Sequence, residues 1–178
     1  MKNKRFSHSL KQKYDLLGKK LAAEIMQDIV KAKLITDNLK EDSGDFTDGF
    51  WDQKYRLPSG KELKVEPEMK DEKWWGNQWS SSRPFRYEDM DIPFRKAKNQ
   101  AHLHIVISTC ENFAFLLTRD AMNEALEESG GMPKIKKTIY EPNGAAYFST
   151  PVNKGYFVYR KKDGRWAKWK KLAKELVK

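Results

Sequence analysis

An eight-residue run, HLHIVIST at residues 102–109, constrains the fold of this chain more than any other segment. Ile105, Val106 and Ile107 are consecutive, apolar and β-branched, so a strand made of them is hydrophobic on both faces. Such a strand needs other elements to cover both faces. NFAFLLT, residues 112–118, is expected to pair with it as the next strand. The sequence therefore predicts a sheet with residues 102–109 at its centre.

Three segments carry helical spacing or helix-end signals, and they are residues 9–36, 93–100 and 119–129. In the first, apolar residues recur every four positions from Leu17 to Ile29. Pro93 suits the first turn of the second. Gly130 and Gly131 close the third.

The remaining segments complete a mixed pattern. Short strands are predicted at residues 145–151 and 155–161, polar loops at residues 37–49 and 74–92, and a basic helix at the C-terminal end. Strands and helices that alternate irregularly indicate an α/β (α+β) class, with a central mixed β-sheet flanked by helices. The 178 residues suit one domain, residues 1–178.

Charge is concentrated at the two ends of the chain. The formal net charge is +10; residues 1–20 carry seven Lys or Arg and one Asp, and residues 154–178 carry ten Lys or Arg and two acids. Basic ends attract a polyanion through phosphate contacts. One cysteine, Cys110, and the absence of a membrane-length apolar run or secretory signal indicate a cytoplasmic, reducing location with no membrane partner.

The segment FWDQKYRLPSGKELKVEPEMKD, residues 50–71, is typical of a β-hairpin that turns at Pro58-Ser59-Gly60. The two-residue period of a strand places Glu66, Glu68 and Lys70 on one face, and Asp52 lies across the turn. Pro67 donates no ladder hydrogen bond, so it favours an edge strand or a bulge. The hairpin is therefore either a charged, solvent-facing edge or a metal-dependent site.

Hydrolysis of a phosphodiester needs carboxylates for a metal ion and a cation near the developing negative charge. Mg²⁺, or Mn²⁺ in its place, prefers oxygen ligands and takes only one or two protein carboxylates beside water and substrate. Asp52, Glu68 and Glu66 are the candidate metal ligands, with Asp48 as the substitute for Asp52. Lys70 would orient the attacking water.

This pattern resembles the PD-(D/E)xK (restriction-endonuclease-like) nuclease superfamily over residues 15–120. Asp52 matches the first acid of the family motif, and Glu68-Met69-Lys70 matches its (D/E)xK triplet. Glu24 matches the acid that the family often carries on its first helix. Trp51 precedes Asp52, where the family pattern has proline. The resemblance implies a restriction-endonuclease-like fold and Mg²⁺-dependent hydrolysis of DNA by an endonuclease or a related hydrolase; it does not identify a subfamily.

A basic cluster just before the central strand favours contact with a nucleic-acid backbone. Its members are Arg95, Lys96, Lys98 and Gln100. Cationic side chains there donate charge-assisted hydrogen bonds to phosphate oxygens, although a solvated helix face has the same composition. DNA is the expected partner, with RNA and a homodimer left open. The alternatives are a non-catalytic nucleic-acid-binding module and an accessory protein that binds an acidic partner.

Two other groups of residues have chemical potential. His102 and His104 are spaced for zinc on one strand face, but no third ligand stands nearby, so structural histidines are favoured. Trp166 and Trp169 stand among lysines, which on a helix suits a nucleic-acid backbone or a membrane interface.

Overall fold

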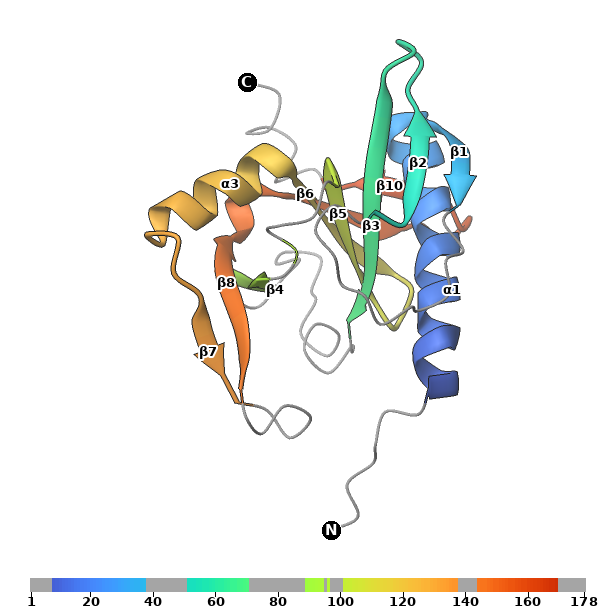
Figure 1. Ribbon diagram of the computed structural model, residues 1–178. Helices are drawn as coiled ribbons and strands as arrows, with labels where there is room; N and C mark the ends of the chain where they lie inside the picture. The colour runs from blue at the N-terminus through green and yellow to red at the C-terminus, as the bar shows by residue number, and fades with distance from the viewer. Residues whose placement is uncertain are drawn as a thin grey trace.

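The computed structural model shows a mixed α+β architecture (Figure 1). It describes residues 8–37, 51–70, 89–94, 96, 101–137 and 144–169. The elements are α1 (His8–Ile25), the π-helical turn η1 (Met26–Val30), β1 (Lys33–Asp37), β2 (Gln53–Arg56), β3 (Glu62–Lys70), β4 (Asp89–Pro93), β5 (Leu103–Ser108), β6 (Phe113–Thr118), α3 (Arg119–Glu128), β7 (Lys134–Lys136), β8 (Ala145–Pro151), the short 3₁₀ turn η4 (Val152–Lys154), β9 (Tyr156–Arg160) and β10 (Trp166–Lys168).

Ten strands form two sheets within the described residues. The larger has seven strands in the order β1-β2-β3-β5-β6-β9-β10, and the smaller has the order β4-β8-β7. Every pairing is antiparallel except that of β3 with β5, which is parallel over six residue pairs. The predicted mixed sheet is confirmed, and β5 lies inside it with all six residues buried.

The two faces of the large sheet are covered by different elements (Figure 1). On one face, α1 packs Leu21 and Ile25 against Val65, Ile105 and their neighbours. On the other face, α3 and the small sheet enclose a second cluster. That cluster consists of Met90, Ile92, Val106, Phe115, Leu117, Met122, Ala125, Phe148 and Phe157.

Most predicted elements are present. The hairpin forms as β2 and β3, residues 112–118 pair with β5 as β6, and β8 and β9 occupy the two predicted short strands. The helix at residues 119–129 is α3, whose N-cap Thr118 accepts a hydrogen bond from the backbone N–H of Ala121. Both closing glycines have a φ of +70°. No helix in the described ranges is long and apolar enough to cross a membrane.

The predicted helix over residues 9–36 is too long. α1 ends at Ile25 and continues as the π-helical turn, which Lys31 terminates in a left-handed conformation with φ of 61°. Residues 33–37 are strand β1, which extends the sheet beside β2. The β-branched residues Ile35 and Thr36 favour this pairing over a further helical turn.

Two further helix predictions differ from the structure. The segment predicted over residues 93–100 has 3₁₀ conformation at Phe94 and Lys96, but it does not begin at Pro93. Pro93 is the last residue of β4 and not the first of a helix, so the strand also replaces the end of the loop predicted over residues 74–92. Trp166 belongs to β10 and is buried in the core instead of lying on a basic helix. β7 was not predicted. Residues 1–7 and 170–178, which include much of the two basic ends, lie outside the described residues.

Pro67 lies in an interior strand, contrary to the expectation of an edge or a bulge. The carbonyl of Val65 faces β2, because it accepts a hydrogen bond from the N–H of Asp52 at 3.2 Å. Strand alternation turns the nitrogen of Pro67 to that same side, where the pairing with β2 has already ended at Val65. The missing N–H therefore costs no ladder hydrogen bond, and β3 continues in regular register with β5 through Lys70.

Gly155 provides a test of the packing on the face covered by α3. A Cβ there would overlap the ring of Phe115 and come within 2.9 Å of the carbonyl oxygen of Leu116. We expect Gly155→Ala to lower the free energy of unfolding by about 1–3 kcal/mol, because overpacking forces neighbouring atoms to move. Gly18→Ala is the control, since its Cβ would meet only the flexible side chain of Met69, at 3.2 Å, and a helix interior favours alanine. Urea unfolding of both variants measures the difference, and equal costs would contradict this account.

Candidate active site

One face of β3 carries a row of charged side chains. Val65 and Met69 pack toward α1 with the first core cluster. The alternation of the strand puts Lys64, Glu66, Glu68 and Lys70 on the opposite face. Glu68 and Lys70 are half-buried, and Glu66 is buried. The structure therefore brings the three predicted residues Glu66, Glu68 and Lys70 onto one face, as the sequence indicated.

Glu66 forms a buried ion pair with Lys96. The ammonium group of Lys96 donates a hydrogen bond to Glu66 Oε1, and the two residues are only 5% and 8% exposed. Glu66 Oε2 is also buried and has no hydrogen-bond partner within the described part of the chain. A buried carboxylate oxygen without a partner costs free energy, so it is a reasonable place to expect a ligand.

Asp52 lies beside this pair at the start of β2. Its N–H donates a hydrogen bond to the carbonyl of Val65, the residue before Glu66, just beyond the last ladder pair of Gln53 with Val65. Burial raises the pKa of Asp52 above its ordinary value, although Lys19 and Lys96 oppose that shift. Burial lowers the pKa of Lys96 to about 8, against the attraction of Asp52 and Asp15. Lys96 therefore links the two acids, because it pairs with Glu66 and its charge acts on Asp52. Perturbed pKa values such as those of Lys96 and Asp52 are common in active sites.

Lys70 is held by a different partner. Its ammonium group donates a hydrogen bond of 2.7 Å to the backbone carbonyl of Asp91 in β4. Lys96, which the sequence suggested as a phosphate contact, is the lysine that the structure pairs with Glu66. Thirty residues separate Lys96 from Glu66 in the chain. No sequence spacing indicated their contact.

Arg119, at the start of α3, holds the backbone around Lys96. Its Nε donates to the carbonyl of Ala101 at 2.9 Å, and its two terminal nitrogens lie 3.3 and 3.4 Å from the carbonyl oxygen of Lys96. The rigid fork of the guanidinium can bridge two carbonyl groups, which a lysine cannot do. Sequence reasoning did not select Arg119, because an arginine at a helix start has no distinguishing signal.

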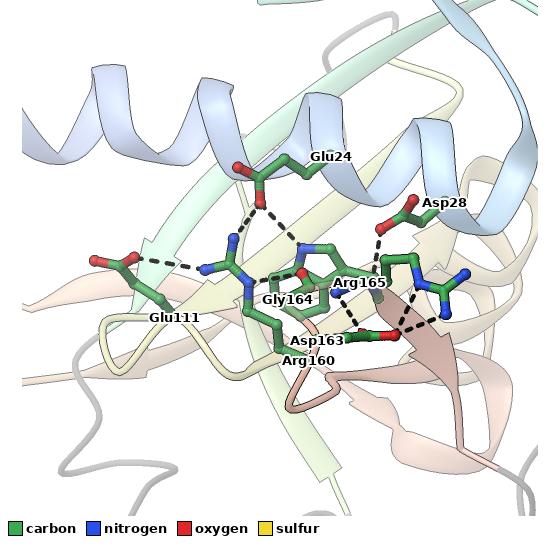
Figure 2. Close-up of polar contacts among 8 residues, drawn as sticks. Glu24, Asp28, Glu111, Arg160, Asp163, Gly164 and Arg165 are labelled. Atoms are coloured by element: carbon green, nitrogen blue, oxygen red, sulfur yellow. Dashed lines mark hydrogen bonds and ion pairs between the residues drawn. The ribbon is translucent and has the colours of Figure 1, made fainter.

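Glu24 is located in another polar network, between α1 and the β9–β10 hairpin (Figure 2). Its Oε2 accepts hydrogen bonds from Arg160 Nη2 at 2.6 Å and from Trp166 Nε1 at 3.4 Å. Glu111 lies 3.9 Å from the same guanidinium, and Asp28 accepts from the N–H of Trp166 at 2.8 Å. In this arrangement Glu24 fastens α1 to β9 and β10, whereas Glu66 belongs to β3 and Asp52 directly precedes β2.

The histidines have distinct environments. His102 Nδ1 accepts a hydrogen bond from the N–H of Lys64 at 2.8 Å, and the N–H of His102 returns one to the carbonyl of Lys64 at 2.8 Å. Burial, followed by the positive charges of Lys64, Lys61 and Arg119, lowers the pKa of His102, which favours the neutral ring that this contact needs. His104 is buried and pairs in register with Glu66.

Metal ligation is restricted to small sets of residues. No group of three or more His, Cys, Asp or Glu side chains that could hold a metal ion occurs among the residues that the structure describes. The two acids Asp52 and Glu66 remain compatible with Mg²⁺, which takes most of its ligands from water and substrate. Several predicted residues lie outside the described ranges, namely Asp48, Arg95, Lys98 and Gln100.

No family model, curated protein or solved structure matches this chain.

Glu24 yields the first prediction for the site region. We expect Glu24→Gln to lower the free energy of unfolding by about 1 kcal/mol, because the carboxylate that receives Arg160 and Trp166 is partly exposed. Urea unfolding checks this, with Glu127→Gln on the exposed side of α3 as the control. A Glu24→Gln protein as stable as wild type would show that the network of Figure 2 does not fasten α1.

The buried Lys96 predicts a rise in stability with pH. The folded-state pKa of about 8 lies below the ordinary value of 10.5, so between these values the unfolded chain binds more protons than the folded one. The contribution of Lys96 to the free energy of unfolding therefore increases as the pH rises through that window. Urea unfolding at about pH 7 and about pH 10 should show a wild-type gain that Lys96→Met lacks and that Lys162→Met, at an exposed lysine, retains. A gain of the same size in Lys96→Met would contradict this assignment.

Proposed function

We propose that this chain is a divalent-metal-dependent nuclease that hydrolyses phosphodiester bonds of DNA. One observation carries the proposal: Glu66 is a buried carboxylate that gives one oxygen to Lys96 and has no hydrogen-bond partner for the other among the described residues. The backbone of Asp52 bonds that of Val65, the residue before Glu66, and the charge of Lys96 acts on both acids. An open, buried acid oxygen beside a second acid fits Mg²⁺ or Mn²⁺ better than it fits a purely structural salt bridge.

The residues then have separate roles. Asp52 and Glu66 would hold the ion, with Glu68 further along the same face as an added ligand. Bound there, the ion would polarise the phosphoryl group and activate water. Lys96 sits against the oxygen of Glu66 and would neutralise negative charge that develops on the phosphate. Lys70, fixed to the carbonyl of Asp91, would orient a substrate or water oxygen from the far end of the row.

The topology also supports a restriction-endonuclease-like fold, which we include in the proposal. A helix, α1, precedes the hairpin that carries the acids, and the acid-bearing strand β3 runs parallel to the central strand β5. The helix, hairpin and central strand follow the order that the resemblance to PD-(D/E)xK nucleases implies, although β1 precedes the hairpin and β4 lies between β3 and β5, where that order has a helix. DNA as the partner follows from the net charge of +10, and RNA as a substrate or a homodimer as the working unit would be variants of the same proposal.

A non-catalytic nucleic-acid-binding module is the second candidate. The observation in its favour is the ion pair itself, because an ammonium group already neutralises Glu66 and can stabilise the fold without any metal. An accessory protein that binds an acidic partner would use the Lys and Arg side chains that give the chain its net charge of +10. Both predict no metal-dependent cleavage.

A cleavage assay on plasmid, linear and branched DNA with Mg²⁺ or Mn²⁺ tests the proposal. We expect Glu66→Gln, Asp52→Asn and Lys96→Met each to reduce the cleavage rate by about 100-fold or more, because each removes a ligand or a charge that acts on the transition state. Glu127→Gln is the matched control and should cleave like wild type. DNA binding without cleavage by the wild type would favour the binding module, and cleavage that survives all three substitutions would exclude this site.

A further inference from the structure

Two lysines stand directly opposite each other on the β2–β3 hairpin. Lys54 and Lys64 are a cross-strand pair in the ladder, one step before the row reaches Glu66. Like charges directly opposite in an antiparallel pair destabilise a sheet. Glu62, which lies 3.2 Å from Lys54, offsets part of this repulsion, and a phosphate bound between the two ammonium groups would offset more of it.

Trp51 holds the two lysines over one aromatic surface. The ammonium of Lys54 lies 5.5 Å and that of Lys64 lies 5.8 Å from the centre of its ring system, both within cation–π range. Lys54 also lies 3.2 Å from Glu62, which in turn binds Arg56 at 3.1 Å. The indole of Trp51, the residue before Asp52 in the chain, therefore holds two cations at one place.

The surroundings of this pair are positively charged. From Gln53 to Lys64, with both ends counted, the chain has four basic residues and one acid. Burial lowers the pKa of the neighbouring His102, and the positive charges of Lys64 and Lys61 lower it further. An anion is the ligand that complements this end of the hairpin.

The pair is continuous with the candidate active site. Lys64 and Glu66 lie on the same face of β3, and alternate residues of a strand are about 7 Å apart. We infer that Lys54, Lys64 and Trp51 form a phosphate-binding subsite that holds the nucleic-acid backbone next to the phosphate at Glu66. This assignment deepens the proposed nuclease function and rests on it for the identity of the ligand.

Binding without cleavage isolates the subsite. Fluorescence anisotropy of a labelled DNA duplex is measured in EDTA over a series of salt concentrations, with wild type, the double variant Lys54→Gln/Lys64→Gln and the control Lys31→Gln/Lys137→Gln. The control lysines are exposed, one directly after η1 and the other directly after β7, and both lie outside the two basic ends of the chain. We expect the Lys54/Lys64 variant to bind about 10-fold more weakly and its log–log salt slope to fall by about one for each lysine. Thermal unfolding confirms that all three proteins are folded.

The outcomes separate this inference from the proposed function. A weaker, less salt-dependent Lys54/Lys64 variant supports the subsite even if no protein cleaves DNA, in which case only the nuclease proposal fails. A variant that binds with the slope of wild type overturns the subsite, whether or not wild type cleaves. An equal loss in the Lys31/Lys137 control also overturns it, since the effect would then come from general charge. A wild type that binds no nucleic acid overturns both.

Discussion

The parallel pairing of β3 with β5 is the constraint on which the rest of the structure depends. Antiparallel neighbours can be joined by tight turns, but two parallel strands require a long crossover, which here includes β4 and Lys96. The pairing places β3 inside the large sheet, with α1 on one side. It therefore forces the charged face of β3 into the protein, where the returning chain can bring a lysine to Glu66.

Burying that charge is costly, and the way it is compensated bears on function. Removing two ions from water costs several kcal/mol, which a close ion pair only partly offsets. Glu66 and Lys96 gain one strong contact, while the second oxygen of Glu66 stays without a partner among the described residues. Apolar residues of similar size would stabilise the fold at least as well. That second oxygen is the place where the proposed metal ion would bind.

Local patterns in the sequence predicted the elements whose stability is local. The β-branched run at residues 105–107 predicted the buried strand β5, and the turn at Pro58–Gly60 predicted the hairpin. Predictions failed where long-range pairing decides the conformation. Residues 33–37 form β1 because they pair with β2, and Trp166 is buried in the core as part of β10. The shared face of Glu66, Glu68 and Lys70 was predictable for the same local reason, namely strand alternation.

The contact of Glu66 with Lys96 was not predictable from strand alternation, because it depends on the path of the chain between β3 and β5. The sequence left two interpretations of the hairpin, a solvent-facing charged edge and a chemical site. An edge strand is excluded by the position of β3 between β2 and β5, and a solvated acid is excluded by the burial of Glu66. Pro67, the residue that argued for an edge, fits the interior because its nitrogen faces the side where β2 has ended. What remains is a charged row with a buried acid in its middle and a lysine pair at one end, and a solvated surface would need neither.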